Sequence, residues 1–321
     1  MHSRWLAACL TALILFTHSS IYAAQAPSYI KWVDFSVTAQ ALHDTMEADI
    51  TRHGTEHPVS WIDLLAVLAA RSGGEFKQYK KAELDAVLAA IDQGKGPQET
   101  AGNEKLYHYY QKAYGAVLGG MLGEYRELYQ DGTCTSGYGL TAYSPIAKGY
   151  GCAHYDDFGA ARSYGYRRPH LGHDLMGSVG TPVIAVEAGY VEACGWNQYG
   201  GWRIGIRSFD GKRYYYYAHL RRNHPYNDMY EGKTVDAGEV IGYLGMTGYS
   251  SKENTNNIDV PHLHFGVQLI FDPSQKDGTN QIWIDLYELT QFLSSNRSSV
   301  EKNAAGEYHA SCVRIPAYAP D

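Results

Sequence analysis

His170-Leu171-Gly172-His173-Asp174, read together with His262-Leu263-His264 far downstream, is the stretch that decides the fold. A histidine and an aspartate four positions apart can close on one ion if the chain turns between them, and Gly172 allows that turn without steric cost. His262 and His264 belong to an apolar run, and in a strand residues two apart point to the same face. We therefore expect both imidazoles to face one site.

The two clusters together offer enough donors for a metal. Zinc in catalytic sites typically takes three ligands from His, Asp, Glu or Cys and keeps a fourth position for water. Two histidines and one aspartate meet that count and leave one histidine over. Because the chain contains 14 histidines, such clusters also arise by chance, so the flanking sequence has to decide.

The flanking sequence resembles the M23 family of zinc metallopeptidases, the lysostaphin or LytM type. The matching motifs follow the family's order between residues 160 and 270, and beyond the first cluster they are Gly180-Thr181-Pro182-Val183, Ala188-Gly189, Tyr217-Ala218-His219-Leu220, Val240-Ile241-Gly242, Gly248 and Pro261-His262-Leu263-His264-Phe265. The resemblance covers about a third of the chain and includes every position that carries the family's chemistry.

The resemblance assigns roles to individual residues. It implies one Zn²⁺ per chain, bound by His170, Asp174 and His264. His219 and His262 match the family's catalytic histidines, and the sequence leaves open which of them moves the proton and which stabilises the attacked carbonyl. His173 matches no role in the family, so we interpret it as a loop residue or one that supports the ligands from behind.

Two positions depart from the family's common pattern. Val260 stands where a glycine often precedes the second cluster, and Gly266 follows it where an acidic residue is common. The segments 221–230 and 250–259 also read as insertions. No ligand position is lost, so these departures bear on substrate fit more than on activity.

Composition limits the class of protein. The chain has 321 residues, of which 45% are hydrophobic and 19% charged, which is ordinary for a soluble globular protein and excludes a disordered or multi-span membrane protein. The formal charge of -7 argues against a nucleic-acid partner. The 28 tyrosines suit a wet groove, because a tyrosine combines an apolar ring with a polar tip.

The first residues predict export. Arg4 precedes an apolar run from Trp5 to Phe16, and small residues around Ala26 suit signal peptidase, so residues 1–26 are predicted to be a signal peptide. The run is shorter than the roughly 20 residues that span a bilayer, so no stable transmembrane span is expected, with an uncleaved anchor as the alternative. The protein would be secreted and located in the cell envelope. The remaining cysteines could pair in three ways or stay reduced, and they are Cys134, Cys152, Cys194 and Cys312.

Residues 27–130 are predicted to form a helical domain. Ser60 and Asp63 form a plausible helix start, and apolar residues follow at helical spacing until Gly73. Two further helical runs span 84–91 and 106–128. No catalytic cluster appears in this region, so it would either position the substrate or cover the groove.

Residues 131–169 are predicted to be a linker followed by a loop rich in Gly and Tyr. His154, Asp156 and Asp157 lie in this loop, where a solvated face is a better interpretation than substrate contact. Residues 170–290 read as short strands separated by hairpin signals, which predicts an antiparallel β domain of the peptidase type, and 291–321 are expected to be a C-terminal tail. The fold class is thus α+β multidomain, with a helical domain followed by an all-β, lysostaphin-like peptidase domain.

The tyrosine run before His219 suggests a groove wall. In an extended strand Tyr215 and Tyr217 share a face with His219, which predicts that they line the groove, while Tyr214 and Tyr216 would cover the exposed face of the sheet.

The resemblance implies a secreted zinc metalloendopeptidase that hydrolyses peptide cross-links of bacterial peptidoglycan through a zinc-activated water. The alternative from another class is a non-catalytic cell-wall-binding or regulatory protein that retains the fold. A third possibility is a peptidase that acts on another exported protein.

Overall fold

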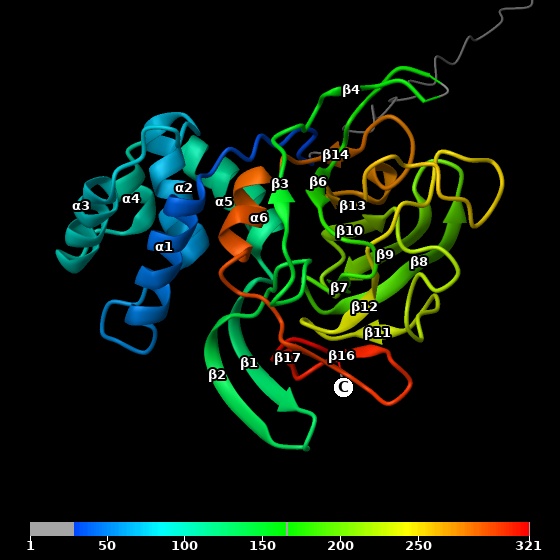
Figure 1. Cartoon of the computed structure of the whole chain (residues 1–321). Helices are drawn as coiled ribbons and strands as arrows, with labels where there is room; N and C mark the ends of the chain where they lie inside the picture. The colour runs from blue at the N-terminus through cyan, green and yellow to red at the C-terminus, as the bar shows by residue number, and fades with distance from the viewer. Residues whose placement is uncertain (1–28, 165, 321) are drawn as a thin grey trace, which may run out of the picture.

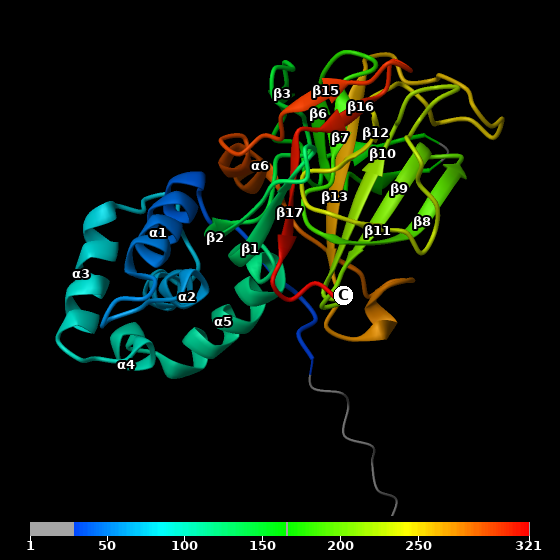
Figure 2. The same ribbon diagram turned by 90° about the horizontal axis from the view of Figure 1, so that it is seen from below.

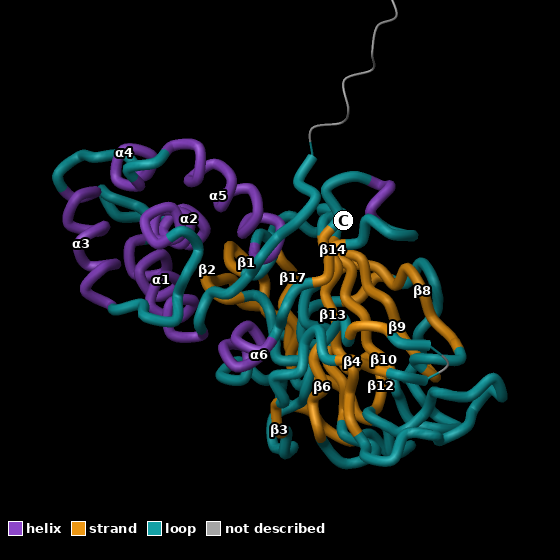
Figure 3. Tube along the Cα trace, turned by 90° about the horizontal axis from the view of Figure 1, so that it is seen from above, coloured by secondary structure: helices purple, strands orange, loops and turns teal. Residues whose placement is uncertain are grey.

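The structure is a computed structural model that describes residues 29–164 and 166–320. Helices gather on one side of the molecule and antiparallel strands on the other (Figure 1 and Figure 3). The predicted signal peptide at residues 1–26 lies outside the described residues. Among the described helices, none combines the length and the apolar character needed to cross a bilayer.

The helical side consists of α1 (Ala39–Arg52), α2 (Trp61–Ser72), α3 (Lys81–Asp92), α4 (Pro97–Ala101) and α5 (Glu104–Leu118). The predicted start of α2 is confirmed, because the Ser60 side chain accepts a hydrogen bond from the backbone N–H of Asp63 at 3.4 Å. Its predicted end at Gly73 is confirmed as well, with a left-handed φ of 70°. The apolar face of α2 is buried, and Trp61 is only 1% exposed.

The prediction of a helix over 106–128 is wrong in its second half. Helix α5 ends at Leu118, and Leu122–Tyr129 is strand β1. Gly119 and Gly120 interrupt the helical pattern, and Gly120 packs so closely on Glu187 that a Cβ atom would lie 1.7 Å from the Glu187 carboxylate. Tertiary packing therefore ends the helix where the local pattern alone would continue it.

The expected linker and tail are also parts of a sheet. Strand β2 (Cys134–Leu140) forms a hairpin with β1, and β17 (Cys312–Pro316) pairs with the other edge of β1. Figure 2 shows β17 running beside β1 between the helices and the large sheet. Residues 131–139 and 291–321 are thus not irregular, and independent folding of the helical part stays a prediction.

The largest sheet carries the two histidine clusters. Its strands are antiparallel and lie in the order β11 (Thr234–Val235), β8 (Gly189–Asn197), β9 (Gly201–Ser208), β10 (Arg213–Ala218), β13 (His262–Leu269), β6 (His173–Met176) and β3 (Ala153–His154), with β14 (Ile282–Trp283) paired to β13. Three smaller pairs are β4 (Ala161–Arg162) with β5 (Arg168–Pro169), β7 (Pro182–Ile184) with β12 (Val240–Tyr243), and β15 (Val300–Lys302) with β16 (Tyr308–Ala310). The short helices η1 (Pro273–Gln275) and α6 (Tyr287–Leu293) follow β13. The predicted fold class, a helical region followed by antiparallel sheets, is confirmed.

Helix α6 lies between the two sides of the molecule (Figure 1). Its Phe292 packs on Trp61 of α2, with ring centroids 5.7 Å apart. On the sheet side, the Arg213 guanidinium donates a hydrogen bond to the Ala116 carbonyl of α5 at 2.8 Å. One continuous hydrophobic core runs through both sides, so the helices are packed on the sheet rather than tethered to it. Within the described residues, the cysteines are unpaired, and they are Cys134, Cys152, Cys194 and Cys312.

Candidate metal and catalytic site

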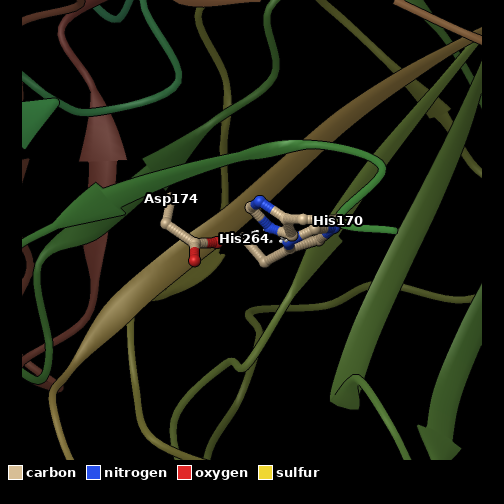
Figure 4. Close-up of side chains that lie close together, drawn as sticks. All are labelled: His170, Asp174 and His264. Carbon is tan, nitrogen blue, oxygen red and sulfur yellow. Dashed lines mark hydrogen bonds and ion pairs between the residues drawn. The ribbon is translucent and has the colours of Figure 1, made fainter. Parts of the chain in front are cut away.

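The three predicted metal ligands meet at the edge between β6 and β13. Asp174 on β6 and His264 on β13 lie directly opposite each other in the antiparallel register, and His170 precedes β6. One ligand atom from each of these residues lies within 4.8 Å of the others. Figure 4 shows the imidazoles of His170 and His264 beside the carboxylate of Asp174. Residues far apart in the sequence therefore converge as predicted.

The distances fit a cation at the centre of the cluster. His170 Nε2 is 2.8 Å from His264 Nδ1 and 3.1 Å from Asp174 Oδ1, and His264 Nδ1 is 3.2 Å from the same oxygen. Burial would raise the pKa of the Asp174 carboxyl, but the neighbouring imidazoles of His170 and His264 lower it far below its usual value. A permanent carboxylate and two imidazoles match the donor set of a catalytic zinc site.

Two residues outside the cluster, Asp157 and Arg162, contact its side chains. The Asp157 backbone carbonyl lies 3.2 Å from His170 Nδ1, so Nδ1 carries the proton and Nε2 presents its lone pair to the cluster. The Arg162 guanidinium donates to Asp174 Oδ2 at 3.0 Å and also contacts the Asp157 carboxylate. The prediction that Asp157 sits on a solvated loop face is therefore wrong, and no spacing signal pointed to Arg162.

Gly172 is needed for a different reason than the turn that we expected. Its φ is not in the left-handed region, so the backbone alone does not require glycine. A Cβ atom at this position would instead lie 2.6 Å from His264 Cε1 and 2.9 Å from the Phe265 carbonyl oxygen. Gly172 therefore lets the chain between His170 and Asp174 pass directly over a ligand imidazole.

The two predicted catalytic histidines lie next to the cluster. The His219 and His262 rings are 4.9 Å apart, and His262 Nε2 is 3.7 Å from Asp174 Oδ1. Each ring is fixed by a backbone carbonyl that accepts from Nδ1–H at 2.8 Å, that of Thr247 for His219 and that of Val260 for His262. Both rings thus present Nε2 as an acceptor. The expectation that His262 and His264 face one site is confirmed.

Burial sets the charge state of His219. The side chain is 5% exposed, and burial together with the nearby His262 and His264 lowers its pKa to about 3. A neutral imidazole can accept a proton, whereas an imidazolium cannot. His219 is therefore neutral at neutral pH, with its Nε2 unprotonated.

His173 does not belong to the site. It is a strand residue whose side chain points to the opposite face of β6, where it contacts His154 at 3.2 Å and packs on Tyr287 of α6. This corrects the interpretation of His173 as a loop residue or a support for the ligands. His154 likewise packs against α6, through Thr290, instead of facing solvent.

The tyrosines of β10 are distributed in the opposite way to the prediction. Tyr215 and Tyr217 are fully buried, whereas Tyr214 and Tyr216 line the hollow beside the metal cluster. The reason lies in His219, whose φ of 60° turns it out of the strand, so that it no longer shares the face of Tyr217. The prediction from strand alternation was therefore wrong, because the backbone leaves the strand at His219.

Two hollows meet at the cluster and form one groove. Both are lined by Arg162, His170, His219, Tyr249 and His264. The first, which we call the Trp283 arm, has a volume of about 290 Å³ and is further lined by Arg168, Pro169, Leu171, Tyr199, Gly200, Tyr214, Tyr216, Ala218, Gln268, Lys276, Asp277, Gln281 and Trp283. The second, the Asn257 arm, has a volume of about 300 Å³ and is further lined by Asp174, Met176, Asn257, Ile258, Asp259, Val260 and His262. No lining residue comes from α1–α5, which disfavours the idea that the helical region covers the groove.

A cluster of two histidines and one aspartate, flanked by two further histidines in an open groove, is the kind of site that metal-dependent hydrolases use. Residues 168–278 match the model of Peptidase family M23. This part of the chain belongs to peptidase family M23, which confirms the resemblance noted in the sequence.

Similar proteins agree with this assignment over the same region. The L-Ala–D-Glu endopeptidase of Bacillus subtilis is 42% identical over 110 residues, which are 34% of this chain and 32% of that protein. The peptidoglycan DD-endopeptidase ShyC of Vibrio cholerae is 34% identical over 101 residues, which are 32% of this chain and 20% of that protein. The chain thus spans less than a third of the length of either relative.

A solved structure shares the fold over a longer range. A chain from Ruminococcus gnavus, described as a candidate glycyl-glycine endopeptidase LytM, aligns with 84% of this chain and 92% of its own length, with a TM-score of 0.55 and 20% sequence identity. This likeness extends well beyond the residues matched by the family model, so the arrangement of helices and sheets is found in another protein.

Proposed function

We propose that the protein is a zinc metalloendopeptidase that hydrolyses peptide cross-links of bacterial peptidoglycan. The observation that carries the proposal is the convergence of His170, Asp174 and His264 within one family M23 domain, with His219 and His262 beside them. A relative named as a peptidoglycan endopeptidase supports the choice of substrate.

The donor set suits zinc, and His170, Asp174 and His264 would hold it. When bound there, zinc would polarise an amide carbonyl and lower the pKa of a water molecule to about 7. Hydrolysis forms a C–O bond from that water and breaks the amide C–N bond, and one proton must reach the leaving nitrogen. His219 accepts this proton at Nε2 because Thr247 fixes its Nδ1–H, and the His262 ring is oriented in the same way by Val260.

The residues around the cluster position the substrate. The two arms of the groove extend to either side of the cluster, so an extended peptide can place one residue in each arm and its amide bond at the centre. Tyr216 and Trp283 give the Trp283 arm an aromatic wall, with ring centroids 6.3 Å apart.

Export to the cell envelope is part of the proposal. Peptidoglycan lies outside the cytoplasmic membrane, and residues 1–26 have the pattern of a signal peptide. Fractionation of cells that express the full chain should find the protein outside the cytoplasm, with a new N-terminus near Ala26. A cytoplasmic protein that keeps Met1 would contradict export.

The proposed activity is tested by digestion of purified peptidoglycan with the chain that lacks residues 1–26. We expect release of soluble fragments with new free amino ends, loss of this activity with a chelator, and recovery on addition of Zn²⁺. Chemical identification of the amino ends would name the bond that is cut.

The matched control is His264→Ala, which removes one ligand of the cluster. If the parent chain binds peptidoglycan but releases nothing with Zn²⁺ present, the non-catalytic binding protein becomes the better description. If the parent instead cleaves only an exported protein, the peptidase assignment stands and the substrate is wrong.

A further inference from the structure

Arg168 carries a positive charge in the Trp283 arm and has no counter-ion there. Its Cζ lies 5.0 Å from the ring centre of Tyr199, 5.4 Å from that of Tyr249 and 5.7 Å from that of Tyr166. Aromatic faces on several sides hold a guanidinium in place through cation–π attraction. The position of this cation is therefore fixed before any substrate arrives.

The hydrogen-bonding capacity of Arg168 is largely unused. A guanidinium has five N–H donors, and among the described residues Arg168 donates one side-chain hydrogen bond, to the Tyr164 carbonyl at 3.0 Å. Within residues 29–164 and 166–320 no carboxylate oxygen lies within 4.0 Å of it, whereas Arg162 contacts both Asp157 and Asp174. Arg168 is thus the arginine of the groove that remains available to an anion.

The other charges of the groove make its two arms unequal. Besides Arg168, the Trp283 arm contains Lys276, whose Nζ is 3.5 Å from Glu192 and lies over the Tyr214 ring at 3.8 Å, and a single acidic residue, Asp277. The Asn257 arm contains Asp174 and Asp259 and shares only the paired Arg162. A negatively charged group is therefore favoured in the Trp283 arm and disfavoured in the other.

Gly266 contributes to the same asymmetry. A Cβ atom at this position would lie 2.8 Å from the Trp283 ring. Gly266 is paired with Tyr216 in the register of β13 and β10. Because Gly266 has no side chain, the Trp283 indole can pack on β13 at this position. The arm thus has an uncharged aromatic wall at this position.

We propose that the Trp283 arm is a subsite for a carboxylate of the peptide substrate, with Arg168 as the residue that selects it. The inference rests on the proposed function, because it describes which peptides the groove accepts. It predicts that the enzyme prefers peptides with a free acidic group on one defined side of the cleaved bond over neutral, glycine-rich peptides. A planar guanidinium suits this task because it can bind a carboxylate through two parallel hydrogen bonds.

The test measures binding, so that it does not depend on turnover. Fluorescence polarisation would give the dissociation constants of labelled alanine hexapeptides that carry one glutamate at each position in turn. The control peptides, one for each, carry glutamine in place of the glutamate. Zinc-loaded protein with the His219→Ala change would be used to prevent cleavage. At one or two positions we expect the glutamate peptide to bind about tenfold more tightly than the matching glutamine peptide. This is the usual contribution of a charge-assisted hydrogen bond to affinity.

Two arginine variants give the matched comparison. Arg168→Gln should remove the preference for glutamate and leave the affinity for the glutamine peptides and the zinc content unchanged. Arg167→Gln should keep the preference, because Arg167 is exposed and lines neither arm. Equal affinities for every pair, no binding of any peptide, or a preference that survives Arg168→Gln would overturn the subsite.

A separate digestion of peptidoglycan by the parent chain distinguishes this inference from the proposed function. Digestion without any preference for glutamate would contradict the proposed subsite and remain consistent with the proposed function. A preference for glutamate without digestion would support the proposed subsite and contradict the proposed function.

Discussion

Gly172 and His264 are in direct contact, and this contact leaves no room for a side chain at position 172. A Cβ atom there would lie 2.6 Å from His264 Cε1 and 2.7 Å from Nε2. The same His264 ring offers Nδ1 to the cluster, 3.2 Å from Asp174. The glycine between His170 and Asp174 therefore restricts the orientation of the His264 ring.

Gly172→Ala should weaken zinc binding although all three ligands remain. The methyl group must push the His264 ring aside, and displacement of an oriented ligand typically costs about tenfold or more in metal affinity. Competition with a chelator of known affinity measures the change. Gly123→Ala is the control, because Gly123 lies in β1 with a φ outside the left-handed region, and a methyl group there would meet no atom within 4 Å. Equal zinc affinity in the two variants would show that the contact does not position His264.

The sequence was sufficient to predict those residues of the site that belong to recognisable motifs. His170, Asp174 and His264 stand at positions that the family motifs mark, and the structure brings them together. Asp157 and Arg162 could not be found in this way, because they reach the cluster from a loop and a two-residue strand without periodicity.

The errors in the fold have a common physical cause. Residues 122–128 continue the apolar spacing of α5, so a local pattern cannot separate helix from strand there. Residues 122–129 form a strand because β1 pairs on one edge with β2 and on the other with β17, which is almost two hundred residues away. Long-range pairing of this kind is set by the whole fold and leaves no local signal.

Substitution of either proposed catalytic histidine should separate metal binding from catalysis. We expect His219→Ala and His262→Ala to keep one zinc per chain, because neither residue is among the three that converge as ligands. Loss of a proton-transfer group should lower turnover between about a hundredfold and ten-thousandfold. Metal analysis and initial rates on peptidoglycan measure the two effects. Near-normal turnover in either variant would remove that histidine from the mechanism.

The Asp236 carboxyl should make stability depend on pH. Burial and the nearby Glu239 raise its pKa in the folded protein from 3.8 to about 6. The folded state therefore favours the protonated form, so the stabilising contribution is complete below pH 3.8 and is lost as the pH rises through about 6.

Asp236→Asn should accordingly raise the free energy of unfolding at neutral pH and change it little near pH 3.8. Urea unfolding at several pH values measures the difference between parent and variant. Asp228→Asn serves as the control, since it removes the same kind of charge from an exposed position. A constant difference for Asp236→Asn would contradict the raised pKa.

The buried ion pair between Arg213 and Glu187 should be the electrostatic contact that matters most for holding the helices on the sheet. Both side chains are almost fully buried, at 0% and 1% exposure, and the guanidinium also donates to the Ala116 carbonyl of α5. Glu187→Gln leaves the arginine with less compensation for its charge in the interior, which should cost about 3 kcal/mol or more in the free energy of unfolding. The comparison is Glu192→Gln, which alters a similar pair with Arg207 whose glutamate is 28% exposed and which should cost about 1 kcal/mol or less. Urea unfolding measures both values, and hydrogen exchange should show faster opening of α5 only in Glu187→Gln. Equal costs, or unchanged exchange in α5, would mean that hydrophobic packing alone fixes the helical region.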